Sequence, residues 1–233
     1  FRVIGCDLWS DHPNFASETA GLGITGICGS GIIEVLAELY LAQVINSDGV
    51  VDGALSARSP RVIADGRTFA YVLHEGKIRI LVTQNDVRAI QLAKAALYAG
   101  VRLLMDKLNV DSVDRIRLAG AFGSHIDVKY AMVLGLIPDC RLENVTSAGN
   151  AAGSGAHIAL VDRNSREEIE REIRRIEKIE TAVETRFQEH FVEAMAIPHK
   201  SAPFDELAKA VTLPLRTDAP SDSRSSGRRR RRR

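Results

Sequence analysis

Residues 84–109 carry apolar side chains at helical spacing. The positions are Val87, Ile90, Leu97, Val101 and Leu104. Residues three, four and seven apart share one face of a helix, so the spacing predicts a single helix with an apolar face. Thr83 and Asp86 precede it as a capping box, in which the hydroxyl and the carboxylate each accept a hydrogen bond from a backbone N–H. Alanines fill much of the remaining surface, so we expect this helix to pack closely and to be buried.

A different pattern occupies residues 61–83, where β-branched and aromatic residues are separated by short turns. Glycine follows an acidic residue at Asp65-Gly66 and again at Glu75-Gly76. Turns of this kind between β-branched and aromatic runs indicate hairpins. The pattern therefore predicts three strands joined by two turns.

Glycine-rich turns stand between an apolar stretch and a helix at 26–31, 120–123 and 149–155. The first opens the amphipathic run "ITGICGSGIIEVLAELYLAQ", and the other two follow predicted strands. The second leads into a short helix over 127–135, which we expect Pro138 to stop. Hairpin-paired strands followed by strands that alternate with helices are typical of an α/β fold with a mixed sheet and packed helices.

The residue pattern leaves two interpretations of these turns open. A helix N-terminus has unpaired N–H groups and a partial positive charge, so it can hold phosphate. Ligands of open α/β sheets also bind at the carboxyl ends of the strands, where such turns lie. Alternatively, the glycines only turn the chain and let helices approach closely.

The C-terminal part is strongly charged. Residues 165–194 predict a long helix capped by Ser165 and Glu168. Its apolar positions are Ile169, Ile173, Ile176, Val183, Phe187 and Phe191. After Pro198 the composition shifts to Pro, Ser, Asp and Arg, which predicts disorder. We therefore expect one domain over residues 1–198 and a disordered basic tail over 199–233.

Composition and charge bear on whether the protein has a nucleic-acid or membrane partner. The 233 residues are 45% hydrophobic and 26% charged, as in ordinary globular proteins. The net charge of +1 conceals a mildly acidic body, because the tail ends in "RRRRRR". Such a tail can contact nucleic acid or an acidic membrane nonspecifically, but we expect neither a specific nucleic-acid partner nor a membrane. The chain opens with Phe1, so we expect it to be part of a longer protein.

The cysteines indicate neither a disulfide framework nor a metal site. Cys6, Cys28 and Cys140 are far apart in the sequence and show no CxxC spacing. A reducing cytoplasm is the simplest setting for such a chain.

Several linked motifs together carry a family resemblance. They are "GICGSGIIE", "LVTQNDVRAIQLAKAALYAGVRLLM", "LAGAFGSHID", "LGLIP", "SAGNAAGSGAH" and "FQEHFVEAMAIP". Over roughly residues 24–198 the chain resembles the C-terminal part of the reductive activators of corrinoid proteins. These are iron–sulfur ATPases of the acetate and sugar kinase/Hsp70/actin superfamily.

The resemblance implies a ribonuclease H-like, actin-like ATPase fold of two subdomains with ATP and Mg²⁺ in the cleft between them. It further implies use of ATP to drive return of an inactive cobalt(II) corrinoid protein of a methyltransferase system to cobalt(I). In the family the electron enters through a [2Fe–2S] cluster in a separate N-terminal ferredoxin-like domain, and a homodimer is one expected assembly. The chain departs from this pattern, since it lacks the cluster cysteines and the two Asp-Ile-Gly-Thr turns that grip phosphates in this superfamily. We therefore expect this chain alone to bind neither ATP tightly nor a cluster.

The same resemblance assigns candidate site residues. The adenosine motif matches Gly120, Ala121, Phe122 and Gly123. The second connecting motif matches Gly149, Asn150, Gly153 and Gly155. Gly29, Ser30 and Gly31 are expected to face the cleft with open N–H groups. No catalytic residue is assigned, and no metal ligand.

Three further residues have two interpretations each. Cys28 is a cluster ligand shared between subunits, as in related activators of acyl-CoA dehydratases, or a small buried thiol, which we favour. Asp127 is a water-mediated Mg²⁺ ligand or, as we favour, the N-cap of the helix that follows. His125 is a proton carrier or corrinoid-facing group or, as we favour, an exposed loop residue.

The function predicted from this resemblance is that of the C-terminal part of an ATP-dependent corrinoid activase. The alternatives are a kinase of the same superfamily, a 2-hydroxyacyl-CoA dehydratase-type activator and a nucleotide-sensing scaffold without turnover.

Overall fold

The structure is a computed structural model, and it describes residues 1–120 and 122–215. The helices are α1 (Phe15–Thr19), α2 (Gly29–Leu41), α3 (Gln84–Leu108), α4 (Val128–Leu134), α5 (Ala151–Val161), α6 (Arg163–Ile173), α7 (Thr185–Glu193) and α8 (Asp205–Ala210). The strands are β1 (Val62–Asp65), β2 (Thr68–His74), β3 (Ile80–Val82), β4 (Ile116–Ala119) and β5 (Val145–Gly149). Short 3₁₀ turns lie at Gly53–Ala57, Phe122–Ser124, Leu142–Asn144 and Thr181–Val183.

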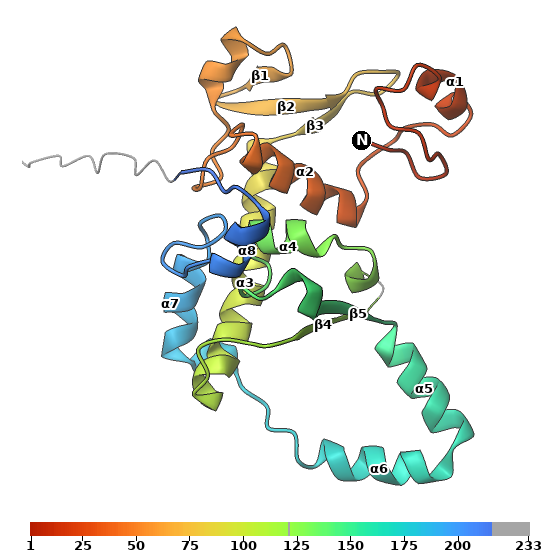
Figure 1. The fold of residues 1–233 in the computed structure, drawn as a ribbon, viewed down its shortest axis with the longest axis vertical. Helices are drawn as coiled ribbons and strands as arrows, with labels where there is room; N and C mark the ends of the chain where they lie inside the picture. Colours follow the sequence, from red (N-terminus) through yellow and green to blue (C-terminus); the bar gives the residue numbers. More distant parts are fainter. Residues whose placement is uncertain (121, 216–233) are drawn as a thin grey trace, which may run out of the picture.

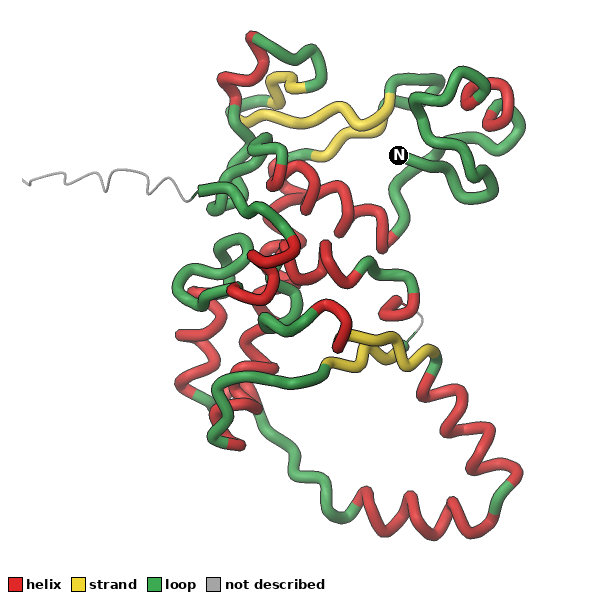
Figure 2. The backbone as a smooth tube through the Cα atoms, in the orientation of Figure 1, coloured by secondary structure: helices red, strands yellow, loops and turns green. Residues whose placement is uncertain are grey.

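The described strands form two sheets. In the first, β1, β2 and β3 pair antiparallel in that order, and Asp65 lies opposite Thr68 across the first turn. In the second, β4 and β5 pair parallel, with Ile116 opposite Val145. The predicted hairpins and the later alternation of strand and helix are confirmed, but the strands are divided between two sheets. The helix between β3 and β4 has 25 residues and spans about 37 Å, which carries the chain away from the first sheet (Figures 1 and 2).

Helix α3 begins and ends close to the predicted residues. The capping box is present: the Thr83 side chain accepts from the N–H of Asp86, and the Asp86 carboxylate accepts from the N–H of Thr83 at 2.8 Å. The helix ends at Asn109, which adopts the left-handed conformation at φ 53°. The buried face is rotated from the predicted one, because Leu97 and Leu104 are 49% and 50% exposed.

The buried face of α3 instead contains small and polar residues. It comprises Val87, Gln91, Lys94, Ala95, Tyr98, Ala99, Leu103 and Met105. The Gln91 amide donates to the carbonyl of Met195, and the Lys94 ammonium donates to the carbonyls of Ala196 and Pro198. The polar side of α3 faces inward because its side chains donate hydrogen bonds to these carbonyls. The small alanine side chains allow α7 to pack closely on α3.

Removing the capping box tests how much α3 depends on its first turn. We expect Thr83→Ala to lower the free energy of unfolding by about 0.5–2 kcal/mol, because a backbone donor loses its partner. Urea melts of wild type and variant measure this. The control is Thr185→Ala at the first residue of α7, whose N-cap Glu184 makes no side-chain cap bond, and it is expected to have little effect. Equal losses at the two positions would contradict the cap interpretation.

The main core lies between α2, α4 and the C-terminal segment. Its fully buried members include Leu36, Tyr40, Met132, Leu134 and Leu207. Helix α4 ends at Gly135, which has φ +72°, three residues before Pro138. The prediction that Pro138 stops this helix is therefore wrong, since a left-handed glycine already ends it.

The C-terminal segment corrects the predicted disorder from residue 199. Residues 199–215 are described, and within them Phe204 and Leu207 are buried at 5% and 0% exposure. The Asp139 carboxylate accepts from the N–H groups of Glu206 and Leu207, which satisfies the first turn of α8. The buried side chains of Phe204 and Leu207 and the Asp139 cap therefore keep the chain packed on the core beyond residue 198. The remainder of the predicted tail, 216–233, lies outside the described residues.

The long helix predicted over 165–194 is replaced by two shorter ones. Asp162, and not Ser165, caps α6 by accepting from the N–H groups of Asn164 and Ser165. Helix α6 ends at Ile173, and α7 begins only at Thr185. Figure 1 shows α5 and α6 extending away from the rest, with the chain returning to place α7 beside α3. The helix is interrupted because α7 packs on α3 while α6 does not. No helix among the residues described is long and apolar enough to cross a membrane.

Candidate functional site

The three glycine-rich turns meet at one edge of the molecule. Strands β4 and β5 are parallel, so the turns that follow them lie at the same edge, and the N–H of Gly120 donates to the carbonyl of Gly149 at 2.8 Å. The first turn joins them, because the α-carbon of Gly29 faces the Phe122 ring. A β-carbon placed on Gly29 would lie 3.0 Å from the Phe122 Cε2 atom. Turns separated by many residues in the sequence therefore form one surface, which we call the glycine edge.

Some glycines at this edge border open space. A β-carbon on Gly120, Gly149 or Gly155 would meet no atom of the described residues within 4 Å. Gly120 and Gly149 also have positive φ, at +101° and +62°, a conformation that other residues adopt only with strain. Open space beside bare backbone is the geometry that lets a ligand lie against the chain.

Other glycines at the edge lie close against neighbouring atoms. A β-carbon on Gly123 would lie 3.1 Å from Cβ of Leu118, and one on Gly31 would lie 3.1 Å from the Cys28 sulfur. A β-carbon on Gly153 would lie 2.6 Å from the Asn150 amide nitrogen. The edge glycines therefore fall into two subsets, one that borders open space and one that lies against neighbouring atoms. Ala121 lies outside the described residues.

The helix N-termini at this edge are capped by the chain's own side chains. The Cys28 sulfur accepts from the N–H of Gly31 at 3.3 Å, and the Asn150 side-chain oxygen accepts from the N–H of Gly153 at 2.9 Å. The Asp127 carboxylate accepts from the N–H of Tyr130 at 3.1 Å, which confirms its predicted role as the N-cap of α4. A ligand at this edge would contact the N–H groups that these caps leave available.

Cys28 corrects the prediction of a buried thiol. It is exposed, because an N-cap side chain lies outside the helix and turns back toward its first N–H groups. The Ser30 hydroxyl, 3.5 Å from the sulfur, and the N–H of Gly31 lower the pKa of the Cys28 thiol. His125 is exposed in its loop, as predicted.

A side-chain hydrogen bond links the two helices beside the edge. The Tyr130 hydroxyl on α4 donates to the Glu38 carboxylate on α2. Burial, followed by this hydrogen bond, raises the pKa of the Tyr130 hydroxyl above its usual range. The tyrosine therefore stays protonated and keeps donating, which holds α2 and α4 together.

The described residues show no metal or cluster site. Among the described residues, no group of three His, Cys, Asp or Glu side chains is placed to hold a metal ion. Cys6 and Cys28 lie on separate segments near the surface, and Cys140 is buried at 3% exposure.

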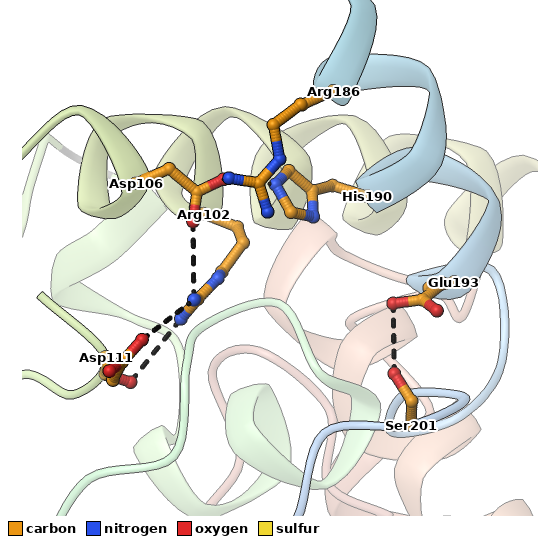
Figure 3. A network of polar contacts seen from close by, with 7 residues as sticks. All are labelled: Arg102, Asp106, Asp111, Arg186, His190, Glu193 and Ser201. Carbon is orange, nitrogen blue, oxygen red and sulfur yellow. Dashed lines mark hydrogen bonds and ion pairs between the residues drawn. The ribbon is translucent and has the colours of Figure 1, made fainter. Parts of the chain in front are cut away.

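A separate cavity lies elsewhere, and the sequence did not predict it. Its volume is about 970 Å³, and α3, α7 and residues 199–206 contribute to its lining. Figure 3 shows Arg186 and His190 of α7 directed toward Asp106 and Arg102 of α3. The spacing of Arg186 and His190, four residues apart on one helix face, was the available signal.

Comparison with known proteins identifies the family. Residues 1–208 match the family described as the C-terminal domain of RACo, the ASKHA domain. The chain belongs to this family. This confirms the predicted ribonuclease H-like, actin-like α/β fold class and the resemblance to reductive activators of corrinoid proteins.

Two similar proteins support the same family assignment. The chain is 34% identical over 172 residues to the corrinoid activation enzyme RamQ of Eubacterium limosum, a match that covers 69% of this chain and 28% of that protein. A solved structure titled a reductive activator for corrinoid, iron–sulfur protein aligns with a TM-score of 0.68 and 33% identity. That alignment covers 76% of this chain and 29% of the solved one. The chain therefore spans less than a third of either relative.

Proposed function

We propose that this ASKHA domain is the C-terminal part of an ATP-dependent reductive activase that returns corrinoid proteins to the cobalt(I) state. One observation carries the proposal: three turns far apart in sequence converge on a single edge, in a chain of the RACo C-terminal family. Names of relatives that refer to corrinoid activation support the same activity.

In this proposal the glycine edge borders the adenosine of ATP. Gly120 and Gly149 leave open space beside their backbone, and the Phe122 side chain is half exposed at 50%. These features support a nucleoside that lies against the chain, with Phe122 available for stacking. Helix α5 begins at the same edge, at Ala151, so occupancy there would bias its position. ATP shifts such an equilibrium only by binding the two conformations with different affinity.

For the remaining cofactors, Mg²⁺ and the [2Fe–2S] cluster, the described residues offer no group of three ligands. Mg²⁺ prefers carboxylates together with phosphates, and Asp127 is already used as a cap. A [2Fe–2S] cluster needs several cysteine ligands, which these scattered cysteines do not supply. We place both groups on the rest of the longer protein, together with the phosphate-gripping turns. The proposed partner is the corrinoid protein of a methyltransferase system, the proposed assembly is a homodimer, and the proposed setting is the cytoplasm.

A chimera tests the proposal. This chain would replace the matching 28% of the Eubacterium limosum corrinoid activation enzyme. We expect the chimera, with its corrinoid protein and a reductant, to form cobalt(I) only when ATP is present, as followed by visible absorption. A folded, cluster-loaded chimera that showed no dependence on ATP would overturn the proposal.

The substitution Gly120→Val in the chimera tests the adenosine assignment. We expect ATP affinity to fall at least about tenfold, or 1.4 kcal/mol, because the side chain would enter the open space beside the backbone. Titration calorimetry measures the affinity. Gly66→Val is the matched control, since Gly66 also has positive φ and open surroundings but lies in the β1–β2 turn. Unchanged affinity in a folded Gly120→Val protein would mean that this turn only packs.

A further inference from the structure

The 970 Å³ cavity is separate from the glycine edge, because none of the edge glycines lines it. Its size is typical of small-molecule sites. By their chemistry the lining side chains fall into three groups, which we call the basic wall, the acidic wall and the aromatic floor.

Three donors of the basic wall share one carboxylate, while Arg141, which also lines the cavity, pairs with Glu143 and Glu206. Arg102, Arg186 and His190 all line the cavity, and each contacts Asp106, whose side chain is 9% exposed. Arg186 and His190 lie 2.9 Å and 2.6 Å from Asp106 Oδ2 (Figure 3).

Arg102 is held only loosely. Its nitrogens lie 3.3 Å from Asp106 Oδ1, 3.3 Å from Asp111 Oδ1 and 3.4 Å from the Asp111 carbonyl. Charge-assisted hydrogen bonds are usually about 2.7–2.9 Å long. The Asp111 side chain is also 99% exposed, so water weakens its attraction. The Arg102 guanidinium therefore retains N–H donors for a further acceptor. The Arg186 guanidinium does as well, because its contact with Asp106 occupies only one of its nitrogens.

The acidic wall is already engaged in structural bonds. Asp139 accepts from two backbone N–H groups of α8, Glu193 accepts from the Ser201 hydroxyl at 2.9 Å, and Glu206 pairs with Lys209 at 2.7 Å. The other acidic residues of the lining are exposed; they are Asp111, Asp114 and Asp205. The cavity thus has spare donors on one wall, while its inner carboxylates already have partners.

The aromatic floor is formed by two buried rings. Tyr98 and His199 are 5% and 6% exposed, and their ring centroids lie 4.7 Å apart. His199 Nδ1 accepts from the N–H groups of Ser201 and Ala202, which fixes the orientation of the imidazole. A planar group entering the cavity would meet these rings.

We propose that this cavity binds a small molecule that carries a carboxylate or phosphate beside a planar apolar part. The anionic group takes the free donors of Arg102 and Arg186 next to His190, and the planar part lies against Tyr98 and His199. The assignment is independent of the nucleotide proposal.

Histidine side-chain NMR of the 233-residue chain tests the proposal with two probes, inorganic phosphate and benzoate, at constant ionic strength. Both probes are expected to shift the His190 resonance with saturation in the millimolar range, and benzoate is expected to shift His199 as well. His125, at the glycine edge, reports any anion bound there instead. Shifts confined to His125, or shifts that never saturate, would overturn the proposal.

Substitutions of Arg186 test whether its guanidinium donates hydrogen bonds to the bound anion. Arg186→Gln is expected to weaken phosphate binding at least about fivefold, while Arg186→Lys, which keeps the charge, is expected to lose less. Arg186 is 57% exposed on its helix, so both variants are expected to fold. Arg163→Gln, at an 84% exposed arginine on α6, is the control and should leave binding unchanged. Equal affinity in Arg186→Gln and wild type would contradict the assignment.

Discussion

Gly135→Ala is expected to lower the free energy of unfolding by roughly 2–5 kcal/mol, the combined effect of left-handed strain and overpacking. Gly135 ends α4 with φ +72°, and a β-carbon there would lie 2.0 Å from the carbonyl oxygen of Pro198. That oxygen cannot move away freely, since it accepts a hydrogen bond from Lys94 at 2.7 Å. Denaturant melts of the 233-residue chain measure the loss.

Gly66→Ala is the matched control for Gly135→Ala. Gly66 has a similar φ of +60°, but a β-carbon there would meet nothing within 4 Å. This variant is expected to lose only about 1–2 kcal/mol, the strain alone. Equal losses in the two variants would show that contact with Pro198 costs nothing.

Lys94→Met is expected to change the pH dependence of stability. Lys94 is 2% exposed, and burial lowers its pKa to about 7. In the unfolded chain a lysine has a pKa of about 10.4. Between about pH 7 and pH 10 the unfolded state therefore binds one more proton than the folded state. Stability of the wild type should rise through this window by about 1.4 kcal/mol per pH unit, and below it this contribution should be flat.

Without Lys94 that rise is absent, so the deficit of the methionine variant should grow from about pH 7 to pH 9. Urea melts at several pH values measure the deficit. Lys77→Met, at an exposed lysine, is expected to keep the wild-type profile. Parallel profiles for wild type and Lys94→Met would contradict the assigned origin of the pH dependence.

Local chemistry explains what could be predicted at the site. Strand-to-helix turns at 120–123 and 149–155 follow from glycine after short apolar strands, and Asp127 is recognisable as a cap from its place before α4. The burial of Cys28 was predicted wrongly, because thiols are often buried and nothing local marks this one as an exposed cap. For the cavity beside Asp106 the only local signal is the spacing of Arg186 and His190, because the contact of His190 with Asp106 joins residues more than eighty positions apart.

The sequence by itself determined the local elements: the capping box at Thr83, the hairpin turn at Gly66, and the strands that precede the glycine turns. Each depends on interactions between residues close in the chain, so composition and spacing suffice. Only the tertiary structure decided that Gly29 faces Phe122, that α3 buries Lys94 rather than Leu97, and that residues 199–215 pack on the core. These depend on which carbonyls and apolar surfaces arrive from distant segments. The buried face of α3 is set by the carbonyls of residues 195–198, which no periodicity within α3 can reveal.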